Sequence, residues 1–297
     1  MRVLLATDGS EDARAATAWL EQFPLPPGSV LRVVSAVSVS PSALDMSMVR
    51  EFQQSMHTEG RRVADVARAA LTKRFATADV HVGEGDARHV ILTAAEEWHA
   101  DLVVLGARGL GAVARFLLGS VSLAVARHAP CSVLVVKGAP APLRGVLVAL
   151  DASPGAAAAS AFLARLPLDR GSTVQLLGVV ERPHYPATTP ALVGGLVREA
   201  LEQIVQERRT ALEQALDKAA SAFGTVERVE RQIVVGHPVD EIVGAAARPG
   251  IDLVVVGARG LGAAQRILLG SVSEDVLRHV DRTVLVVKPS ARGAGTP

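Results

Sequence analysis

The sequence carries one glycine-rich segment twice. The first copy, GARGLGAVARFLLGSVS, spans Gly106 to Ser122, and the second, GARGLGAAQRILLGSVS, spans Gly257 to Ser273, 151 residues later. Each copy follows an apolar run opened by an aspartate, at 101–105 and 252–256. Both keep the same spacing: a glycine, two residues, a glycine, nine residues, then Gly-Ser. Because 151 residues is about one domain length, the repeat predicts two domains of one fold.

The chemistry that suits this spacing is phosphate binding. A short apolar run is typical of a strand buried in a parallel sheet. We expect the glycines at its carboxyl end to take positive φ and to let the backbone approach a ligand without a Cβ in the way. Gly119-Ser120 and Gly270-Ser271 then fall where a helix begins. Free N–H groups and the helix dipole favour an anion there, and the serine hydroxyl adds a hydrogen bond or reaches a phosphate-bound metal.

The glycines have two other interpretations. In the first, they serve only to pack strand tightly against helix. In the second, they form a known dinucleotide or P-loop motif. Neither copy contains GxxxxGK[ST], and neither contains a lysine. The match of Gly109-x-Gly111-x-x-Ala114 to the dinucleotide fingerprint is weak, because no acidic residue stands about twenty positions further on.

Each half also opens with an apolar strand that ends at an aspartate. Arg2 to Thr7 leads to Asp8-Gly9-Ser10, and Gly145 to Leu150 leads to Asp151. Residues 29–37 and 173–180 are predicted to form the second strands. On spacing alone, Asp8 and Asp151 can be ligand contacts or plain caps of the helix that follows, and Ser10 is an alternative cap.

The glycine pattern together with the early aspartate resembles the ATP-binding signature of the universal stress protein family, over nearly the whole chain. The resemblance implies two tandem five-stranded parallel α/β domains, related to adenine-nucleotide-binding (Rossmann-like) folds. It also implies that the last strands of the two domains pair edge to edge, which one tandem chain can do internally as a pseudo-dimer. The domains are predicted at 1–137 and 144–288, joined by a linker at 138–143.

The resemblance also implies one ATP in each half, with the base beside the second strand. Arg108 and Arg259 are included because a guanidinium fork suits phosphate oxygens, with Arg115 and Arg266 as alternatives. The other interpretation is that these arginines face solvent, because the backbone donors of the glycine-rich segment suffice for the phosphates. The predicted contacts in the first half are Ala6, Thr7, Asp8, Ala36, Gly106, Arg108, Gly109, Gly111, Gly119, Ser120, Val121 and Ser122. Those in the second half are Asp151, Val179, Gly257, Arg259, Gly260, Gly262, Gly270, Ser271, Val272 and Ser273.

Composition narrows the class of partner and the compartment. The 31 basic and 30 acidic residues leave a net charge of +1, which gives no sign of a nucleic-acid partner. A single cysteine, Cys131, favours a reducing compartment. The chain begins directly in a predicted strand, and no apolar run is long enough to cross a bilayer. We therefore expect a cytoplasmic protein without a leader or a membrane anchor.

Long amphipathic helices are predicted at 44–75 and 192–223, with the charged run around Arg208 on a solvated face. The less regular segments 38–47 and 181–195 follow strands and are predicted to be lids or plain connections.

The favoured function is an ATP-binding stress-response regulatory protein that binds ATP with or without Mg²⁺ and acts as a homodimer with an unidentified regulatory protein partner. The alternatives are a slow ATPase or phosphotransferase, and an interaction protein with empty sites. No catalytic residue is assigned, because no paired acid and base accompanies the glycines.

Overall fold

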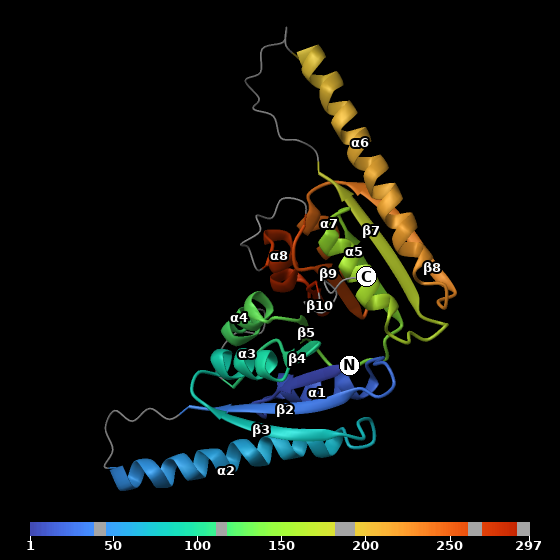
Figure 1. Ribbon diagram of the computed structural model, residues 1–297. Coiled ribbons are helices and arrows are strands. Elements are labelled where there is room, and N and C mark those ends of the chain that lie inside the picture. The colour runs from blue at the N-terminus through green and yellow to red at the C-terminus, as the bar shows by residue number, and fades with distance from the viewer. Residues whose placement is uncertain (39–45, 111–117, 182–193, 261–268, 290–297) are drawn as a thin grey trace, which may run out of the picture.

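The computed structural model describes residues 1–38, 46–110, 118–181, 194–260 and 269–289. Its strands form one ten-stranded sheet in the order β3-β2-β1-β4-β5-β10-β9-β6-β7-β8 (Figure 1). The first half contributes the first five strands of this order. The five strands of the second half follow in the reverse order, so that β10 lies next to β5 and β8 lies at the far edge. The expected α/β class with two five-stranded domains is confirmed.

The helices and strands alternate along each half. Those of the first half are β1 (Arg2–Ala6), α1 (Glu11–Gln22), β2 (Val30–Val37), α2 (Met46–Ala70), β3 (Ala78–Glu84), α3 (Ala87–Glu97), β4 (Leu102–Gly106), α4 (Ser120–His128) and β5 (Ser132–Val136). Those of the second half are β6 (Gly145–Leu150), α5 (Pro154–Ala164), β7 (Thr173–Val180), α6 (Gly194–Ser221), β8 (Arg228–Val235), α7 (Pro238–Ala246), β9 (Leu253–Gly257), α8 (Ser271–His279) and β10 (Thr283–Val287).

Within each half all strand pairs are parallel, and the two halves meet through the antiparallel pair β5–β10. Val135 lies opposite Val284, and Val133 lies opposite Val286. Both strands are fully buried, because Val and Leu occupy most of their positions and both faces are covered by helices. The two domains therefore form the predicted internal pseudo-dimer.

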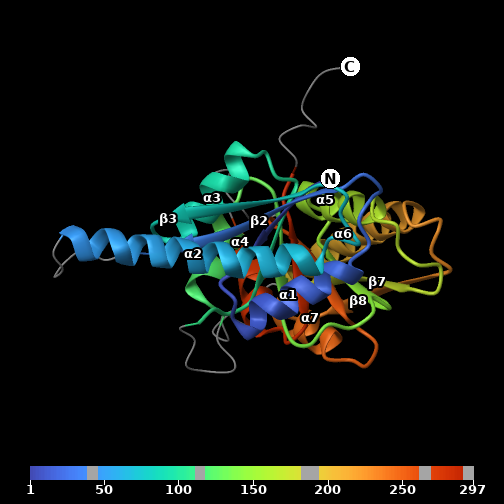
Figure 2. The ribbon, with the colours of Figure 1, turned by 90° about the horizontal axis from the view of Figure 1, so that it is seen from below.

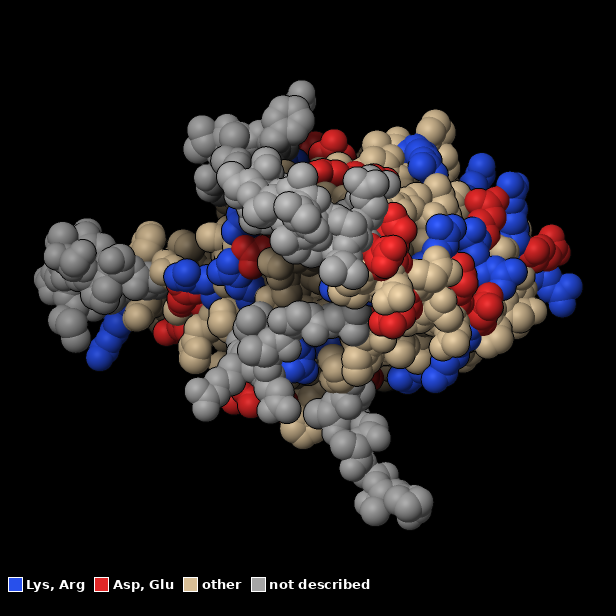
Figure 3. Space-filling view, turned by 90° about the horizontal axis from the view of Figure 1, so that it is seen from above, with Lys and Arg blue, Asp and Glu red and all other residues tan. Residues whose placement is uncertain are grey.

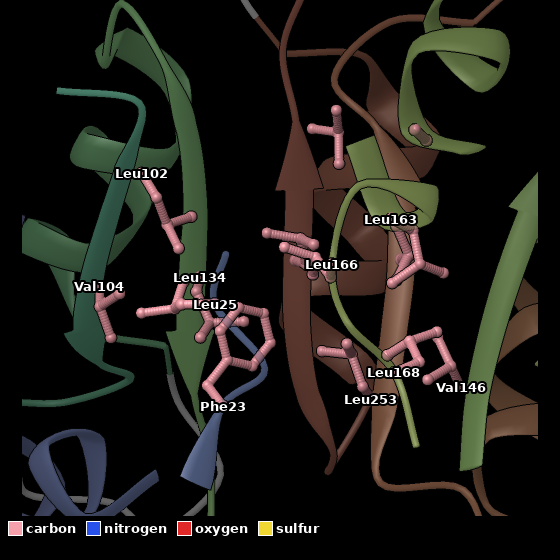
Figure 4. Close-up of a cluster of buried hydrophobic side chains, with 14 of the residues drawn as sticks. Phe23, Leu25, Leu102, Val104, Leu134, Val146, Leu163, Leu166, Leu168 and Leu253 are labelled. Atoms are coloured by element: carbon pink, nitrogen blue, oxygen red, sulfur yellow. The ribbon is translucent and has the colours of Figure 1, made fainter. Parts of the chain in front are cut away.

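The helices cover both faces of the sheet. One buried cluster gathers side chains from α1, α2, α5 and α6, and the other gathers those from α3, α4, α7 and α8. Figure 2 shows the helices α1 and α2 of the first half on one side of β2. The first cluster runs through both halves: Phe23 and Leu25, which follow α1, and Leu166 and Leu168, which follow α5, belong to it (Figure 4).

Polar contacts also join the halves. The Lys137 Nζ donates to the carbonyls of Leu277 and Val280 at 2.6 and 2.5 Å, at the carboxyl end of α8. The Lys288 Nζ donates in the same way to Arg127 and Ala129 at 3.0 and 2.6 Å, at the carboxyl end of α4. Each lysine thus caps a helix of the opposite half, where a cation is favoured by the helix dipole.

The long helices are shorter than the predicted ranges 44–75 and 192–223, because each gives way to a turn before the phenylalanine that ends its apolar pattern. Most of the predicted lids, 38–47 and 181–195, lies outside the described residues. No helix in the described ranges is both long enough and apolar enough to cross a membrane.

Candidate functional site

The candidate site of each half lies where the sheet order changes direction. In the first half, β1 and β4 are neighbours, and α1 and α4 lie in the clusters on opposite faces of the sheet. The chain segments that leave β1 and β4 therefore separate and open a crevice at the carboxyl ends of these strands. Asp8 follows β1, and the glycine-rich segment follows β4. The second half places Asp151 and its own glycine-rich segment at the ends of β6 and β9 in the same way.

The two early aspartates bind the loops around them and do not cap a helix. The Asp8 Oδ1 accepts the Ser10 N–H at 3.0 Å, and its Oδ2 accepts the Leu110 N–H at 3.0 Å. The cap of α1 is Ser10, which accepts the Ala13 N–H at 3.2 Å. Asp151 likewise accepts the Ser153 N–H, while the Ser153 hydroxyl caps α5. The helix-cap interpretation is therefore wrong for both aspartates.

The described loop glycines do not have positive φ, contrary to our expectation. Positive φ among the described glycines occurs at Gly9, Gly28, Gly85, Gly138 and Gly250, none of which belongs to the repeated segment. At four of the loop positions glycine is required for a different reason, because neighbouring atoms leave no room for a Cβ: Gly106, Gly109, Gly257 and Gly260.

The neighbour differs from one loop glycine to the next. A Cβ on Gly106 would lie 2.6 Å from the backbone carbon of Asp12 in α1, so this glycine lets strand and helix touch. Gly257 meets the backbone of Gly155 in α5 in the same manner. A Cβ on Gly109 would lie 2.5 Å from the Asp8 Oδ2, and Gly260 faces Asp151 likewise. The first pair supports the packing interpretation, whereas the second pair belongs to the crevice itself.

The helices that follow the glycine-rich segments have uncapped N-termini. The N-cap residues of α4 and α8 are Gly119 and Gly270, and neither helix has a side-chain cap. By contrast, the side chains of Ser10, Asp86 and Ser153 cap α1, α3 and α5, while α7 has no side-chain cap either but begins with Pro238, which has no N–H. The first N–H groups of an α-helix have no acceptor within the helix. With no capping side chain among the described residues, those of α4 and α8 are available to an anion.

Residues 120–122 and 271–273 carry these N–H groups. Ser120 and Ser271 are exposed at the first helical position, whereas Ser122 and Ser273 are buried. The Ser122 hydroxyl donates to the Gly106 carbonyl at 2.8 Å, and the Ser273 hydroxyl donates to Gly257 at 2.6 Å. These two hydroxyls hold the helix against the preceding strand, and the backbone N–H remains the group that can reach a ligand. Val121 and Val272 are half-buried between them and pack on the core.

The two loop arginines have different surroundings. The Arg108 Nε and Nη2 donate to the two carboxylate oxygens of Asp12 at 2.8 and 2.9 Å, and this hydrogen bonding raises the arginine's pKa. The second half has Gly155 at the position of Asp12. The Arg259 carbonyl there accepts the Ser153 hydroxyl at 3.3 Å, and the chain passes close to Gly155. The solvent-facing interpretation is thus incomplete for Arg108, which is half-buried and ion-paired.

The second strands extend beyond the first strands at the crevice. β7 pairs with β6 only as far as Gly178, yet pairs with β8 through Val180. β2 pairs with β1 as far as Val34 and with β3 through Val37. The edges of Val179 and Ala36 that face the crevice are therefore not paired in the sheet. Ala6 and Thr7 are buried at the end of β1, and the Thr7 N–H donates to Val34.

A cavity of about 680 Å³ opens at the second crevice. Its wall includes Asp151, Val179, Gly257, Arg259, Gly260, and residues 270–273, all of which were predicted. It also includes Arg208 of α6, which the sequence placed on a solvated helix face. An alignment of the two long helices could have identified Arg208, because the first helix has Gly60 at the corresponding position.

Gly111 and Gly262 lie outside the described residues, as do Arg115 and Arg266. Among the described residues, no group of three or more His, Cys, Asp or Glu side chains is placed to hold a metal ion. Figure 3 shows basic and acidic side chains interspersed over the described part of the upper face.

The fold and the crevices define a tandem pair of Rossmann-like α/β domains joined through one sheet. The model of the universal stress protein family matches residues 1–137 and 142–288. The chain belongs to the universal stress protein family.

Similar proteins support this assignment over part of the chain and over nearly all of it. A universal stress protein of Mycobacterium tuberculosis is 35% identical over 196 residues, which cover 64% of this chain and 63% of that protein. One of Mycolicibacterium smegmatis is 27% identical over 301 residues, covering 97% of each. The crystal structure of a universal stress protein from Archaeoglobus fulgidus has a TM-score of 0.65 at 22% identity and covers 98% of this chain and 97% of that one. The last comparison bears on the fold alone.

Proposed function

We propose that the chain is an ATP-binding regulatory protein of the stress response, with one adenine-nucleotide site in each half. The observation that carries the proposal is the pair of helices whose N-cap residue is a glycine of the repeat. Both α4 and α8 begin at a glycine without a capping side chain, while α1, α3 and α5 are capped by Ser or Asp. A helix N-terminus with free N–H groups suits a phosphate because the donors and the dipole act together.

The remaining parts of each crevice fit an adenine nucleotide. At the phosphate end, Gly119 and Gly270 carry no side chain that would compete with the ligand. At the other end, the unpaired strand edges at Ala36 and Val179 offer backbone donors and acceptors to the base. A cavity of about 680 Å³ is within the usual range for small-molecule sites. The predicted site residues of both halves are retained as the proposed contacts.

Arg108 and Arg259 are proposed to act at the phosphate end. Arg108 is oriented by Asp12 through two hydrogen bonds, so its remaining guanidinium N–H groups are held in a defined direction. Arg259 belongs to the wall of the second cavity. If Mg²⁺ accompanies the nucleotide, the exposed hydroxyls of Ser120 and Ser271 and the carboxylates of Asp8 and Asp151 are the protein groups that would approach it.

The domain bounds 1–137 and 144–288 are part of the proposal, together with a cytoplasmic location, assembly into a homodimer and a regulatory protein partner. A dedicated phosphoryl-transfer enzyme would need placed metal ligands and a group that orients the nucleophile. We assign no catalytic residue, and propose at most slow ATP hydrolysis.

The test is a calorimetric titration of the full chain with ATP, followed by assays of phosphate release with Mg²⁺. We expect two ATP molecules per chain and no rapid, saturable release of phosphate. Fast turnover would replace the regulatory proposal with the enzyme. The absence of binding at millimolar ATP would favour an interaction protein without nucleotide. A mass spectrum of small molecules released from the purified protein would identify which adenine nucleotide is retained.

A further inference from the structure

The two halves differ at one position of their long helices that faces the crevice. Residues 48–75 and 196–223 align without a gap, and Val49-Arg50-Glu51 matches Val197-Arg198-Glu199. In this alignment Glu59 corresponds to Glu207 and Phe75 to Phe223, yet Gly60 corresponds to Arg208. The first half has no side chain where the second half has a guanidinium.

Gly60 has no room for a side chain. It is buried, and a Cβ at this position would lie 2.6 Å from the Val37 Cγ1 and 3.2 Å from the Val82 Cγ1. Helix α2 therefore lies directly against the carboxyl ends of β2 and β3. The strand residue that corresponds to Val37 is Val180, so the strands carry a valine at this position in both halves. The difference between the two halves here therefore lies on the helix, where Arg208 replaces Gly60.

Arg208 lies beside β7 in the wall of the cavity at the second crevice. It belongs to the cavity wall together with Val179, Val180 and Glu181, and its Nη1 donates to the Glu181 carbonyl at 3.3 Å. Residues 270–273 and the glycine loop form another part of the wall, contributed by β9 and α8. The guanidinium is therefore held next to the unpaired edge of β7 by a neutral acceptor, and no described carboxylate is paired with it.

We propose that Arg208 is a specificity-determining residue of the second site, which contacts the adenosine half of the nucleotide and makes the two sites unequal in affinity. This inference rests on the proposed function, because it deepens the same site. A guanidinium is planar and can lie over the adenine ring or donate to ribose hydroxyls. One such contact strengthens binding by about 3- to 10-fold. The first site lacks this contact because Gly60 carries no side chain.

The experiment separates the two sites and then removes the arginine. Gly119→Asp places a carboxylate at the start of α4 and leaves the second site intact, and Gly270→Asp does the converse at α8. Arg208→Ala is introduced into each background and into the wild-type chain. Arg209→Ala is the matched control, because Arg209 is the next residue of the same helix, is exposed, and pairs with Glu213 at 3.4 Å. Binding of ATP, AMP and inorganic tripolyphosphate is measured by calorimetry.

In the Gly119→Asp background, Arg208→Ala is expected to raise the Kd for ATP and for AMP by the same 3- to 10-fold factor, which is about 0.6–1.4 kcal/mol. Tripolyphosphate binding is expected to stay unchanged, since it has no adenosine. Arg208→Lys should restore only part of the affinity, because an ammonium has no plane. In the Gly270→Asp background and for Arg209→Ala, no change is expected.

Several results would overturn the inference while leaving the proposed function intact. One is ATP binding in both backgrounds that is insensitive to Arg208→Ala. Another is equal weakening of tripolyphosphate, which would place Arg208 at the phosphate end. If the Gly119→Asp protein does not fold, the wild-type titration still decides the matter, since Arg208→Ala must weaken one of two binding events. Failure of the wild-type chain to bind ATP would instead overturn the proposed function and the inference with it.

Discussion

At the scale of single residues, the glycines of the repeat differ in what they contact. Gly106 and Gly257 allow a strand to touch the first turn of a helix, whereas Gly109 and Gly260 lie against the carboxylates of Asp8 and Asp151. The same residue type therefore serves packing at one position and the geometry of the crevice three residues later. A substitution at the second kind of glycine should disturb the site more than the core.

Gly109→Ala is predicted to weaken ATP binding at the first site by about tenfold, or about 1.4 kcal/mol. The added methyl group would lie 2.5 Å from the Asp8 Oδ2, so the carboxylate must move and lose its hydrogen bond to Leu110. Calorimetry in the Gly270→Asp background would measure the effect on this site alone.

The matched control is Gly171→Ala. Gly171 has no heavy atom within 4 Å of an added Cβ and lacks positive φ, so this change should alter neither binding nor the melting temperature. A folded Gly109→Ala protein with unchanged affinity would contradict the role given to the Asp8 contact.

For the glycine-rich segments, the sequence indicated which positions matter but not the conformations or contacts of those residues. Spacing singled out the glycines, whereas the role of Asp8 came from the family resemblance, since spacing alone left a helix cap open. It failed on φ and on the hydrogen bonds of Ser122 and Ser273, because these depend on how closely a helix approaches the strand. It also failed on Arg208, since helical periodicity says which residues are polar but not that a polar face lies over a cavity.

At the scale of helices and strands, the N-cap residue determines whether the first N–H groups of a helix are bonded to a side chain or can bind a ligand. Ser10 and Ser153 close α1 and α5 with a hydroxyl, and α4 and α8 begin at glycines that supply none. Gly270 has φ −72° and ψ 154°, an extended conformation that any N-cap residue can adopt. The nearest atom to an added Cβ, the Ala258 oxygen, would be at 3.5 Å, which is an ordinary contact.

Gly270→Asp is therefore predicted to abolish ATP binding at the second site without destabilising the protein. The new carboxylate can cap the first turn of α8 and interact favourably with the helix dipole, which stabilises a helix by about 0.3–1 kcal/mol. The same carboxylate occupies and repels the phosphate position. Binding and urea-induced unfolding would be measured on the same preparation.

Binding and stability of Gly270→Asp are interpreted together. Lost binding with equal or higher stability supports an anion site at α8. Retained ATP binding at the second site in this variant would show that the phosphates do not use the N-terminus of α8.

At the scale of the whole molecule, the two halves are joined by more than the β5–β10 strand pair. Lys137 and Lys288 reach across the junction to carbonyls at the ends of α8 and α4, and Arg127 pairs with Glu274 through two hydrogen bonds. Parallel strands and tandem domains could be predicted from periodicity and from the repeat. The edge that joins the halves came only from the family resemblance, because an apolar strand pattern does not reveal its neighbour.

The junction should make stability depend on pH. Burial lowers the pKa of Lys137 to about 8, against the opposing charge of Asp281, and burial lowers that of Lys288 to about 8, between Cys131 and Arg259. The Cys131 thiol has its pKa raised to about 12 by burial and stays neutral over this range. Between pH 8 and about 10.4, the unfolded chain therefore holds protons on these lysines that the folded chain has released.

The free energy of unfolding is accordingly predicted to rise with pH in this window, by up to about 1.4 kcal/mol per pH unit for each lysine. Below pH 8 both states hold the proton and the dependence vanishes. A neutral amine still has two N–H groups for the two carbonyls, so deprotonation does not remove the helix caps. Urea unfolding from pH 7 to 10 should show a steeper rise for the wild-type chain than for Lys137→Met/Lys288→Met. Parallel curves would mean that the two amines are not desolvated.

The central claim is that glycine-capped helix N-termini hold the phosphates of an adenine nucleotide in both halves. A crystal structure of the full chain grown with ATP tests it most directly. The claim predicts phosphate oxygens within hydrogen-bond distance, about 2.7–3.2 Å, of the N–H groups of residues 120–122 and of residues 271–273. Nucleotide bound away from these helices, or both crevices filled by protein side chains at saturating ATP, would contradict it.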